Sequence, residues 1–155
     1  MKRPLLLSLL AASSGLLLLG QGNVLQVVPG DVVKAKAGSS VTAKLKLELR
    51  QGYHVNSDKP ADEYLIPLRL TWTDGVLSGA SVVYPKPQME KLPFADKPLA
   101  VYTGEFDLTT TFKVSPTAAA GPAAVTGKLR YQACNDRMCL PPKNLDVNIQ
   151  LDIVK

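Results

Sequence analysis

The sequence predicts an all-β fold, and within that class an immunoglobulin-like antiparallel β-sandwich. Apolar and polar residues alternate along several segments, most clearly over Ser40–Arg50, and this pattern is typical of strands with one buried and one solvated face. Turn signals such as Pro29–Gly30 and Asp74–Gly75 separate the segments at short intervals. No segment shows a sustained helical period. About seven to nine short strands with frequent turns are typical of two packed sheets.

Eight segments carry the alternating pattern or a short β-prone run. In chain order they are 24–28, 31–36, 40–50, 66–73, 76–84, 106–114, 125–133 and 145–153. Asp74–Gly75 predicts a hairpin between the fourth and fifth of them. Pro67 cannot donate a hydrogen bond to a neighbouring strand, so it predicts an edge position or a bulge in the fourth.

The segment Pro85–Pro98 is predicted to be a long loop. It contains four prolines, and we expect Met89, Leu92 and Phe94 to be exposed within it. Long loops in compact domains are often functional, so this segment is a candidate part of a site.

Residues 1–22 have the pattern of a secretory signal peptide. The basic pair Lys2–Arg3 precedes the apolar run Leu5–Leu19, and small residues follow up to Gly22. The run is shorter than the ~20 residues that a membrane span needs. We therefore predict cleavage after Gly22, a single mature domain over 23–155 without a membrane span, and a periplasmic or otherwise exported location. A retained N-terminal anchor is the alternative.

Charge and motifs exclude several function classes. The formal net charge of +5 includes the two positive charges of Lys2–Arg3, and the other lysines are scattered along alternating segments, as on a solvated face. No basic block is interleaved with aromatic residues, so we expect no nucleic-acid partner. The chain has a single histidine, no G-x-S-x-G motif and no glycine-rich phosphate loop, which argues against a serine hydrolase or a nucleotide enzyme.

The two cysteines, Cys134 and Cys139, lie close together near the end of the chain. An even number of cysteines in an exported chain favours a disulfide. The four residues between them, Asn135–Met138, suit a hairpin built on a type I turn, and such a hairpin brings facing residues within reach of a disulfide. Strand parity places Cys134 opposite the apolar face that Tyr131 and Ala133 share, so it should point towards solvent or a covering loop.

Three interpretations of this cysteine pair follow from the residues alone. A disulfide closing so small a ring stabilises a fold by only about 2 kcal/mol, so the bond is either a weak structural staple in a binding or scaffold module, or a redox pair. Neither a helix N-terminus nor a C-x-x-C motif lowers the thiol pKa, so we expect thiols that exchange with a more reactive partner. The third interpretation is a Cu(I) site, for which the soft candidate ligands are Cys134, Cys139, Met138, Met89 and His54.

Three further residues or residue sets have a simple interpretation, and for two of them a functional one is also open. His54 is most simply a hydrogen-bonded strand residue. Phe94 is either a mobile cap over the thiols or a plug at the end of the core. Asp96 and the pair Asp62–Glu63 are either solvated loop charges or proton carriers.

Several motifs resemble one known family. Tyr131–Cys134 and Cys139–Pro142 are similar to the cysteine motif of the N-terminal periplasmic domain of the thiol:disulfide interchange protein DsbD, in which an aromatic-Gln-Gly/Ala-Cys segment and a Cys-aromatic/Leu-Pro-Pro segment flank a short polar loop. Gly52–Pro60 and Asp62–Pro67 are similar to early strands of that family. The resemblance covers most of residues 23–155.

The resemblance implies an immunoglobulin-like domain that exchanges electrons by thiol:disulfide interchange, an activity of the protein-disulfide reductase type. It implies that Cys134 and Cys139 are the redox pair and that Phe94 is the aromatic residue of a cap loop. Supporting residues around such a site would be Tyr53, Asp96, Tyr102 and Tyr131. No cofactor or metal is implied. The implied partners are thioredoxin-fold periplasmic proteins and a membrane electron carrier, which would be a separate protein.

Two departures from the family pattern accompany the resemblance. Four residues separate the cysteines, where the best-known branch has five. Leu92–Pro93 stands where that branch has an acidic pair before the cap aromatic, so a proton-handling role for that pair does not carry over.

Overall fold

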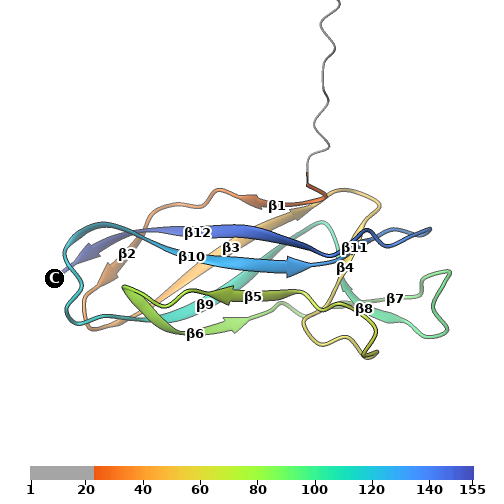
Figure 1. Cartoon of the computed structure of the whole chain (residues 1–155), viewed down its shortest axis with the longest axis horizontal. Helices are drawn as coiled ribbons and strands as arrows, with labels where there is room; N and C mark the ends of the chain where they lie inside the picture. The colour runs from red at the N-terminus through yellow and green to blue at the C-terminus, as the bar shows by residue number, and fades with distance from the viewer. Residues whose placement is uncertain (1–22) are drawn as a thin grey trace, which may run out of the picture.

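The computed structural model describes residues 23–155, all of whose regular structure is β (Figure 1). The predicted signal peptide, residues 1–22, lies outside the described residues. The strands in chain order are β1 (Leu25–Val28), β2 (Val33–Lys36), β3 (Ser40–Leu49), β4 (His54–Asn56), β5 (Arg69–Trp72), β6 (Leu77–Val83), β7 (Gln88–Glu90), β8 (Leu99–Tyr102), β9 (Glu105–Val114), β10 (Gly121–Tyr131), β11 (Ala133–Cys134) and β12 (Lys143–Val154). The all-β prediction is confirmed.

The strands between residues 25 and 154 form three sheets. Two of them, ordered β1-β3-β9-β6 and β2-β12-β10-β5, make the layers of an immunoglobulin-like sandwich, and the small sheet β11-β4-β8-β7 lies at one end of it (Figure 1). All strand pairs are antiparallel except β2 with β12, which is parallel. The predicted sandwich is therefore confirmed, with one parallel pair added at an edge.

The core lies between the two large sheets. Along β3 every second side chain is buried, as its alternating sequence predicts, and these apolar side chains meet those of β10 and β12 from the opposite sheet. Two clusters fill the interior. One contains Leu47, Leu108 and Leu129 beside the small sheet, and the other contains Phe112 and Ile153.

Trp72 of β5 packs against both core clusters and also contacts the opposite layer. Its ring meets Phe112 of β9 edge to face, with ring centroids 5.4 Å apart, and its indole N–H donates to Thr110 Oγ1 at 3.0 Å. Gly127 of β10 makes room for this arrangement. A Cβ atom there would lie 2.7 Å from the Thr71 carbonyl oxygen and 2.7 Å from the indole ring, so a larger residue would displace the tryptophan.

The predicted hairpin at Asp74–Gly75 is wrong. The strand before it, β5, pairs with β10 in one sheet, and the strand after it, β6, pairs with β9 in the other, so the turn crosses between layers. An Asp-Gly signal reports a tight turn, but the available sheet edges decide which partners the flanking strands take. Pro67 precedes β5, which is an edge strand, and this agrees with one of the two positions expected for it.

The segment Pro85–Pro98 is also more ordered than predicted, because it contains β7, which pairs with β8. Met89 and Phe94 are exposed as expected. Leu92 is not: it is 9% exposed, so the loop after β7 folds back towards the body of the domain instead of projecting into solvent.

Candidate functional site

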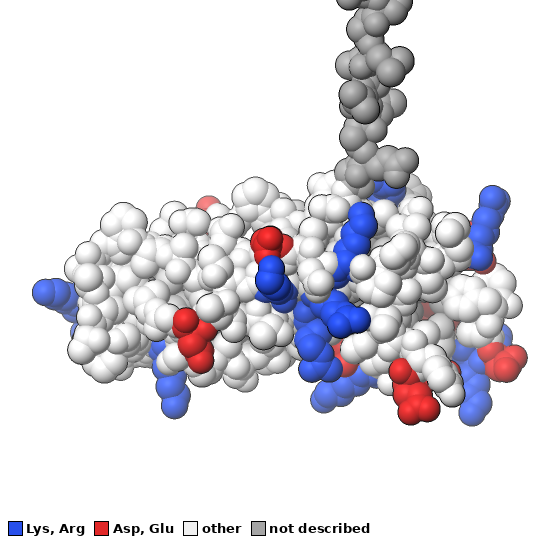
Figure 2. Space-filling view, in the orientation of Figure 1, with Lys and Arg blue, Asp and Glu red and all other residues white. Residues whose placement is uncertain are grey.

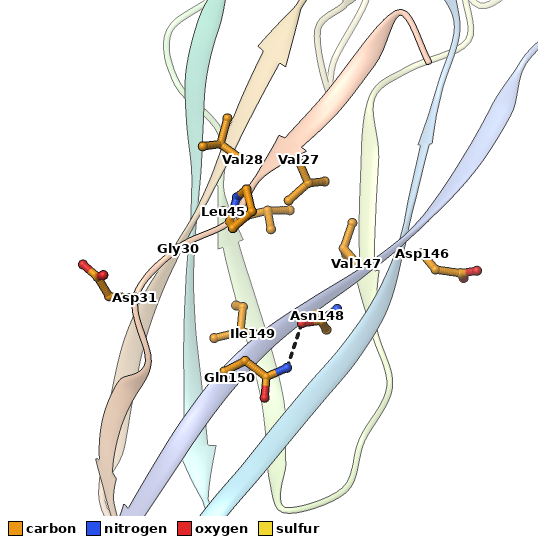
Figure 3. Close-up of a pocket in the computed structure, with 11 residues that line it drawn as sticks. Val27, Val28, Gly30, Asp31, Leu45, Asp146, Val147, Asn148, Ile149 and Gln150 are labelled. Atoms are coloured by element: carbon orange, nitrogen blue, oxygen red, sulfur yellow. Dashed lines mark hydrogen bonds between the residues drawn. The ribbon is translucent and has the colours of Figure 1, made fainter. Parts of the chain in front are cut away.

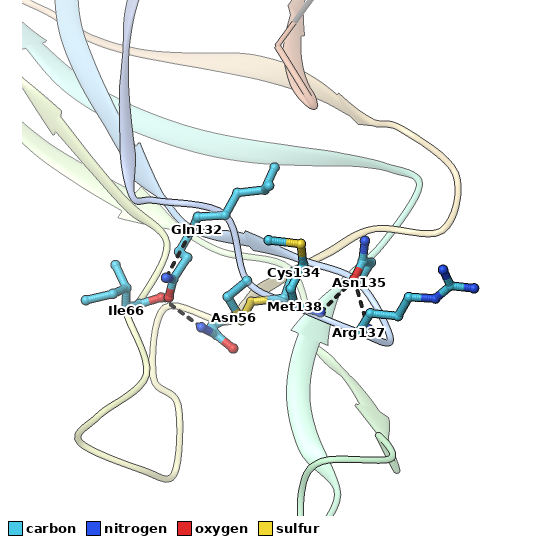
Figure 4. The surroundings of a disulfide bond; sticks show 9 residues. Asn56, Ile66, Gln132, Cys134, Asn135, Arg137 and Met138 are labelled. Carbon is cyan, nitrogen blue, oxygen red and sulfur yellow. Dashed lines mark hydrogen bonds between the residues drawn. A yellow bond between two sulfur atoms is a disulfide. The ribbon is translucent and has the colours of Figure 1, made fainter. Parts of the chain in front are cut away.

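The cysteines close a hairpin at one end of the molecule, beside the small sheet (Figures 1 and 4). Cys134 Sγ and Cys139 Sγ are bonded to each other, and the two Cα atoms are 3.9 Å apart. Backbone hydrogen bonds flank the pair on both sides, from Leu140 N to Ala133 O at 2.8 Å and from Asn135 N to Met138 O at 2.9 Å. The cysteines therefore occupy a non-hydrogen-bonded pair of a hairpin, the arrangement in which facing side chains lie closest.

Asn135 holds the tip of this hairpin. Its side-chain oxygen accepts hydrogen bonds from the backbone N–H groups of Arg137 and Met138, both at 2.9 Å (Figure 4). Asparagine favours such turns because its short amide can bond its own backbone two or three residues on. The tip is thus defined locally, by the sequence between the cysteines.

The chain changes sheets just before the first cysteine. β10 ends at Tyr131, Gln132 lies outside any strand, and Ala133–Cys134 forms β11 beside β4 of the small sheet. Gln132 Nε2 donates to the carbonyl of Leu140 at 3.1 Å, which ties the break to the exit of the hairpin. This step carries the hairpin out of the large sheet and over the end of the sandwich.

Both faces of the small sheet are buried at its strand β4. Directly paired residues share a face, and one face carries Val55, Tyr102 and Ala133, all of which belong to the core cluster. The other face carries the paired residues His54 and Cys134, which belong to neither core cluster. Strand parity therefore correctly predicts that Cys134 lies on the face opposite that of Ala133. The solvent-facing alternative is wrong, because Cys134 is only 2% exposed.

The two cysteines differ in exposure. Cys134 is buried, whereas Cys139, on the outer strand of the hairpin, is exposed. A thiolate from another protein can therefore approach the Cys139 side of the disulfide, while the Cys134 side is covered. Sequence parity could not reveal this difference, because it depends on the loops that fold over the small sheet.

Phe94 belongs to a tight loop that follows β7. The loop is closed by a hydrogen bond from Ala95 N to Leu92 O at 3.1 Å, and Lys91 Nζ bonds the backbone carbonyls of Ala95 and Asp96. The Phe94 ring stacks on the His54 ring, with centroids 6.4 Å apart and the planes at 20°. Since His54 is the direct partner of Cys134, Phe94 lies over the same face of the small sheet as the buried sulfur.

The other predicted supporting residues fall into two groups. Tyr102 and Tyr131 lie in the core, and Tyr53 packs against its margin. The Tyr102 hydroxyl bonds Asp58 Oδ1 at 2.8 Å and lies 3.1 Å from the Pro85 carbonyl, so it fastens the loop after β4 to the small sheet. Asp96, in contrast, is exposed at the base of the Phe94 loop.

Burial perturbs the tyrosines of the site. It raises the pKa of the Tyr102 hydroxyl, and the hydrogen bond to Asp58 raises that pKa further, because ionisation would place two negative charges together. Burial also raises the pKa of Tyr131. The backbone of Leu25 partly lowers this pKa again. The Tyr131 hydroxyl nevertheless makes no hydrogen bond of standard geometry. Both tyrosines are therefore neutral structural groups at neutral pH.

The environment of His54 differs from the simplest expectation. The sequence predicts a hydrogen-bonded strand residue, but His54 is 4% exposed and its Nε2 atom has no hydrogen-bond partner among residues 23–155. Burial lowers the pKa of the imidazole, and the negative charge of Glu90 only partly opposes this. No local sequence signal distinguishes this histidine, since its surroundings come from β7, β11 and the Phe94 loop.

The lowered pKa of His54 makes stability depend on pH. The unfolded chain binds a proton near pH 6.5, whereas the folded imidazole binds it only at lower pH, so protonation favours unfolding. Stability is expected to be constant above about pH 6.5 and to fall as the pH drops from there to the folded pKa. Urea unfolding between about pH 7.5 and 5.5 would measure this, and His54→Leu should remove the slope, because His54 is the only histidine. An unchanged slope in that variant would contradict the assignment.

Of the five candidate Cu(I) ligands, His54 and Cys134 are direct partners across β4 and β11. Cys134 and Cys139 are bonded to each other, and Met89 and Met138 are exposed. Within residues 23–155 no three His, Cys, Asp or Glu side chains are grouped so that they could hold a metal ion.

A hollow of about 540 Å³ adjoins the hairpin on the side of β4. Tyr53, His54, Glu90, Leu92 and Asp136 contribute to its wall. The hollow therefore brings solvent next to His54, although the residue itself is buried.

A second groove, of about 260 Å³, lies along the seam between β1 and β12, away from the hairpin end (Figure 3). Its walls include the aliphatic side chains of Leu45, Val147 and Ile149, and Gln150 Nε2 donates to Asn148 Oδ1 at 3.0 Å across its rim. It contains none of the predicted site residues.

Charged side chains of both signs are scattered over the face shown in Figure 2, and lysine and arginine gather near the middle of this view. Arg69 and Arg130 pair directly across β5 and β10, and the neighbouring Lys128 bonds Asp146 at 2.6 Å.

Among residues 23–155, the search for an apolar helix that could span a membrane finds none.

The fold and the site together define an immunoglobulin-like sandwich domain that presents a disulfide in a hairpin at its end, with one cysteine exposed and the other buried. The family model described as "Thiol:disulfide interchange protein DsbD, N-terminal" matches residues 23–151. The chain belongs to this family, which confirms the resemblance.

Solved structures with similar folds include the reduced N-terminal domain of DsbD from Neisseria meningitidis. It is 19% identical, the match covers 70% of this chain and 76% of that one, and the TM-score is 0.42. The PapD-like domain 7 of human CEP192 is 11% identical over 92% of this chain and 96% of that one, with a TM-score of 0.38. A comparison with curated proteins found no match.

Proposed function

We propose that this chain is a periplasmic domain, residues 23–155, that passes electrons through Cys134 and Cys139. Its electron donor is a thioredoxin-like protein or a membrane redox carrier, and its acceptors are oxidised periplasmic proteins. The observation that supports this most strongly is the asymmetry of the disulfide, with Cys139 exposed and Cys134 buried in a hairpin at the end of a rigid sandwich.

The exchange proceeds in two steps. A thiolate of the donor attacks Cys139 Sγ, the bond to Cys134 Sγ breaks, and the electron pair remains on Cys134. A second thiolate of the donor then attacks the donor sulfur of the mixed disulfide and releases Cys139 as a thiolate. Two protons from solvent complete the products: the donor has become a disulfide and this chain a dithiol. Delivery to an oxidised protein is the same sequence in reverse.

The surroundings of the hairpin suit a protein partner. Exposed apolar side chains occur at Tyr64, which is 84% exposed, at Met138 and at Phe94. A hollow of about 740 Å³ lies between the loop containing Tyr64 and the loop containing Phe94. Exposed apolar groups on and around such a hollow favour docking of another protein surface.

Phe94 acts as the cap in this proposal. Its stacking on His54 covers the face that carries Cys134, and its 52% exposure leaves it free of tight packing, so the loop can move aside when a partner docks. Tyr102 and Tyr131 support the site as members of the core cluster beneath it, and Tyr53 packs against that cluster.

Reduction of the disulfide by a purified, reduced thioredoxin-fold protein tests the proposal. We expect the chain to gain two alkylatable thiols at a rate that depends on the concentration of the donor, and to have a reduction potential above about −300 mV. A chain that stays oxidised under these conditions, with a potential below that value, would instead have a structural disulfide. A donor with both active-site cysteines replaced by serine is the control.

A further inference from the structure

His54 and Cys134 form one unit on the covered face of the small sheet. They are directly paired across β4 and β11, so their side chains leave the same face at neighbouring positions. Phe94 stacks on the imidazole, with the ring centroids 6.4 Å apart. His54 is therefore both the ring partner of the cap residue and the strand partner of the buried cysteine.

The burial of His54 without a partner for Nε2 requires an explanation. Most buried polar atoms in proteins are hydrogen-bonded, and one that is not lowers stability. The charged and titratable groups around the hollow on this side are Glu48, Tyr53, Glu90, Glu105 and Asp136. None of them bonds Nε2, so this nitrogen is free to accept a proton.

We propose that His54 is the general base for Cys134, a role that rests on the proposed function. When the reduced chain delivers electrons, Cys139 thiolate first attacks the disulfide of the partner, and a mixed disulfide forms. Cys134 must then attack Cys139 Sγ, and a thiol has to lose its proton before it can do so. His54 Nε2 takes that proton.

The step balances as follows. The proton of Cys134 moves to His54, and the resulting thiolate attacks Cys139 Sγ. The bond between Cys139 and the partner sulfur breaks, and its electron pair leaves with the partner as a thiolate. The chain is thereby oxidised to the Cys134–Cys139 disulfide, the partner is reduced, and the imidazolium returns its proton to water in the hollow beside it.

The environment explains why a base is needed there. A buried thiol has a raised pKa, because the thiolate loses its hydration, so few Cys134 thiolates form unaided near pH 7. The lowered pKa of His54 keeps the imidazole neutral and able to accept a proton at that pH. A thiolate formed beside an imidazolium is also less costly than a lone buried anion.

The experiment follows the reduced chain after mixing with dithiobis-nitrobenzoate, whose released thiolate is coloured. The first phase reports attack by Cys139, and the second reports release of the second coloured thiolate by Cys134. We expect His54→Gln and His54→Leu to leave the first phase unchanged and to slow the second by about 10²-fold at pH 7. We also expect the second phase to become about tenfold faster per pH unit in these variants, whereas in the wild type it should vary little above the pKa of His54.

Gln51→Ala, an exposed position on the rim of the same hollow, is the matched control and should change neither phase. Two variants are used because the leucine substitution also removes the buried unpaired nitrogen and so favours folding. If both folded variants keep the wild-type rate and pH profile of the second phase, the role of His54 as a base is refuted while the proposed function stands. If the wild type shows no second phase, the proposed function itself fails.

Discussion

Cys134→Ser is expected to capture a thioredoxin-fold partner as a stable mixed disulfide through Cys139, and Cys139→Ser is expected to capture none on the same timescale. In the first variant the exposed thiol remains, and the residue that would release the partner is gone. In the second variant the remaining thiol is that of Cys134, which is buried. It can react only when the Phe94 loop moves away from the face of the small sheet that carries it. An opening free energy of about 1.4 kcal/mol or more would slow its attack by tenfold or more.

The measurement uses a thioredoxin-fold protein that retains a single active-site cysteine, activated as a mixed disulfide with thionitrobenzoate. Release of the coloured thiolate gives the rate, and non-reducing electrophoresis with mass spectrometry identifies the bonded cysteine. The variant that lacks both cysteines gives the background. Equal rates for the two single variants would mean that exposure does not select the attacked sulfur, and this would contradict the proposed assignment of Cys139.

Phe112→Ala is expected to have the largest effect on stability, a loss of about 3–5 kcal/mol. The side chain is 1% exposed and meets Trp72 edge to face, so its removal leaves a cavity at the contact that joins the two layers. For a domain of this size we expect the melting temperature to fall by roughly 10–20 °C. Urea unfolding monitored by tryptophan fluorescence measures the change, because Trp72 is the only tryptophan.

Phe106→Ala is the matched control for this substitution. Phe106 lies on the same strand and stacks on Tyr102 with centroids 5.0 Å apart, but it is only partly buried. Its truncation should therefore cost less than that of Phe112. If the two variants lose equal stability, the contact between Trp72 and Phe112 is not the main link between the layers.

Much of the fold could be predicted because it is encoded locally. The alternation along Ser40–Arg50 predicts a strand with one buried face, and β3 is buried at every second position. The short, Asn-initiated connection between the cysteines predicts a hairpin, and Asn135 caps the turn with its own side chain. Both features depend on residues that are neighbours in the sequence.

Strand partners could not be predicted in the same way. Asp74–Gly75 resembles a hairpin turn, but β5 and β6 belong to different layers. Likewise, the proline-rich segment contains β7, because β8 offers it an open edge. Sheet edges are supplied by distant parts of the chain, so no local pattern reports them.

The β-sandwich class, the disulfide hairpin and the family of this protein can be predicted from the sequence, because alternation, turn residues and the cysteine motif are all local. The burial of Cys134, the exposure of Cys139 and the unpaired Nε2 of His54, the strand partner of Cys134, become visible only in the folded chain. They cannot be predicted locally, because burial and pKa depend on what packs over a residue. Here the covering groups come from the Phe94 loop and the small sheet, which only the folded chain brings together.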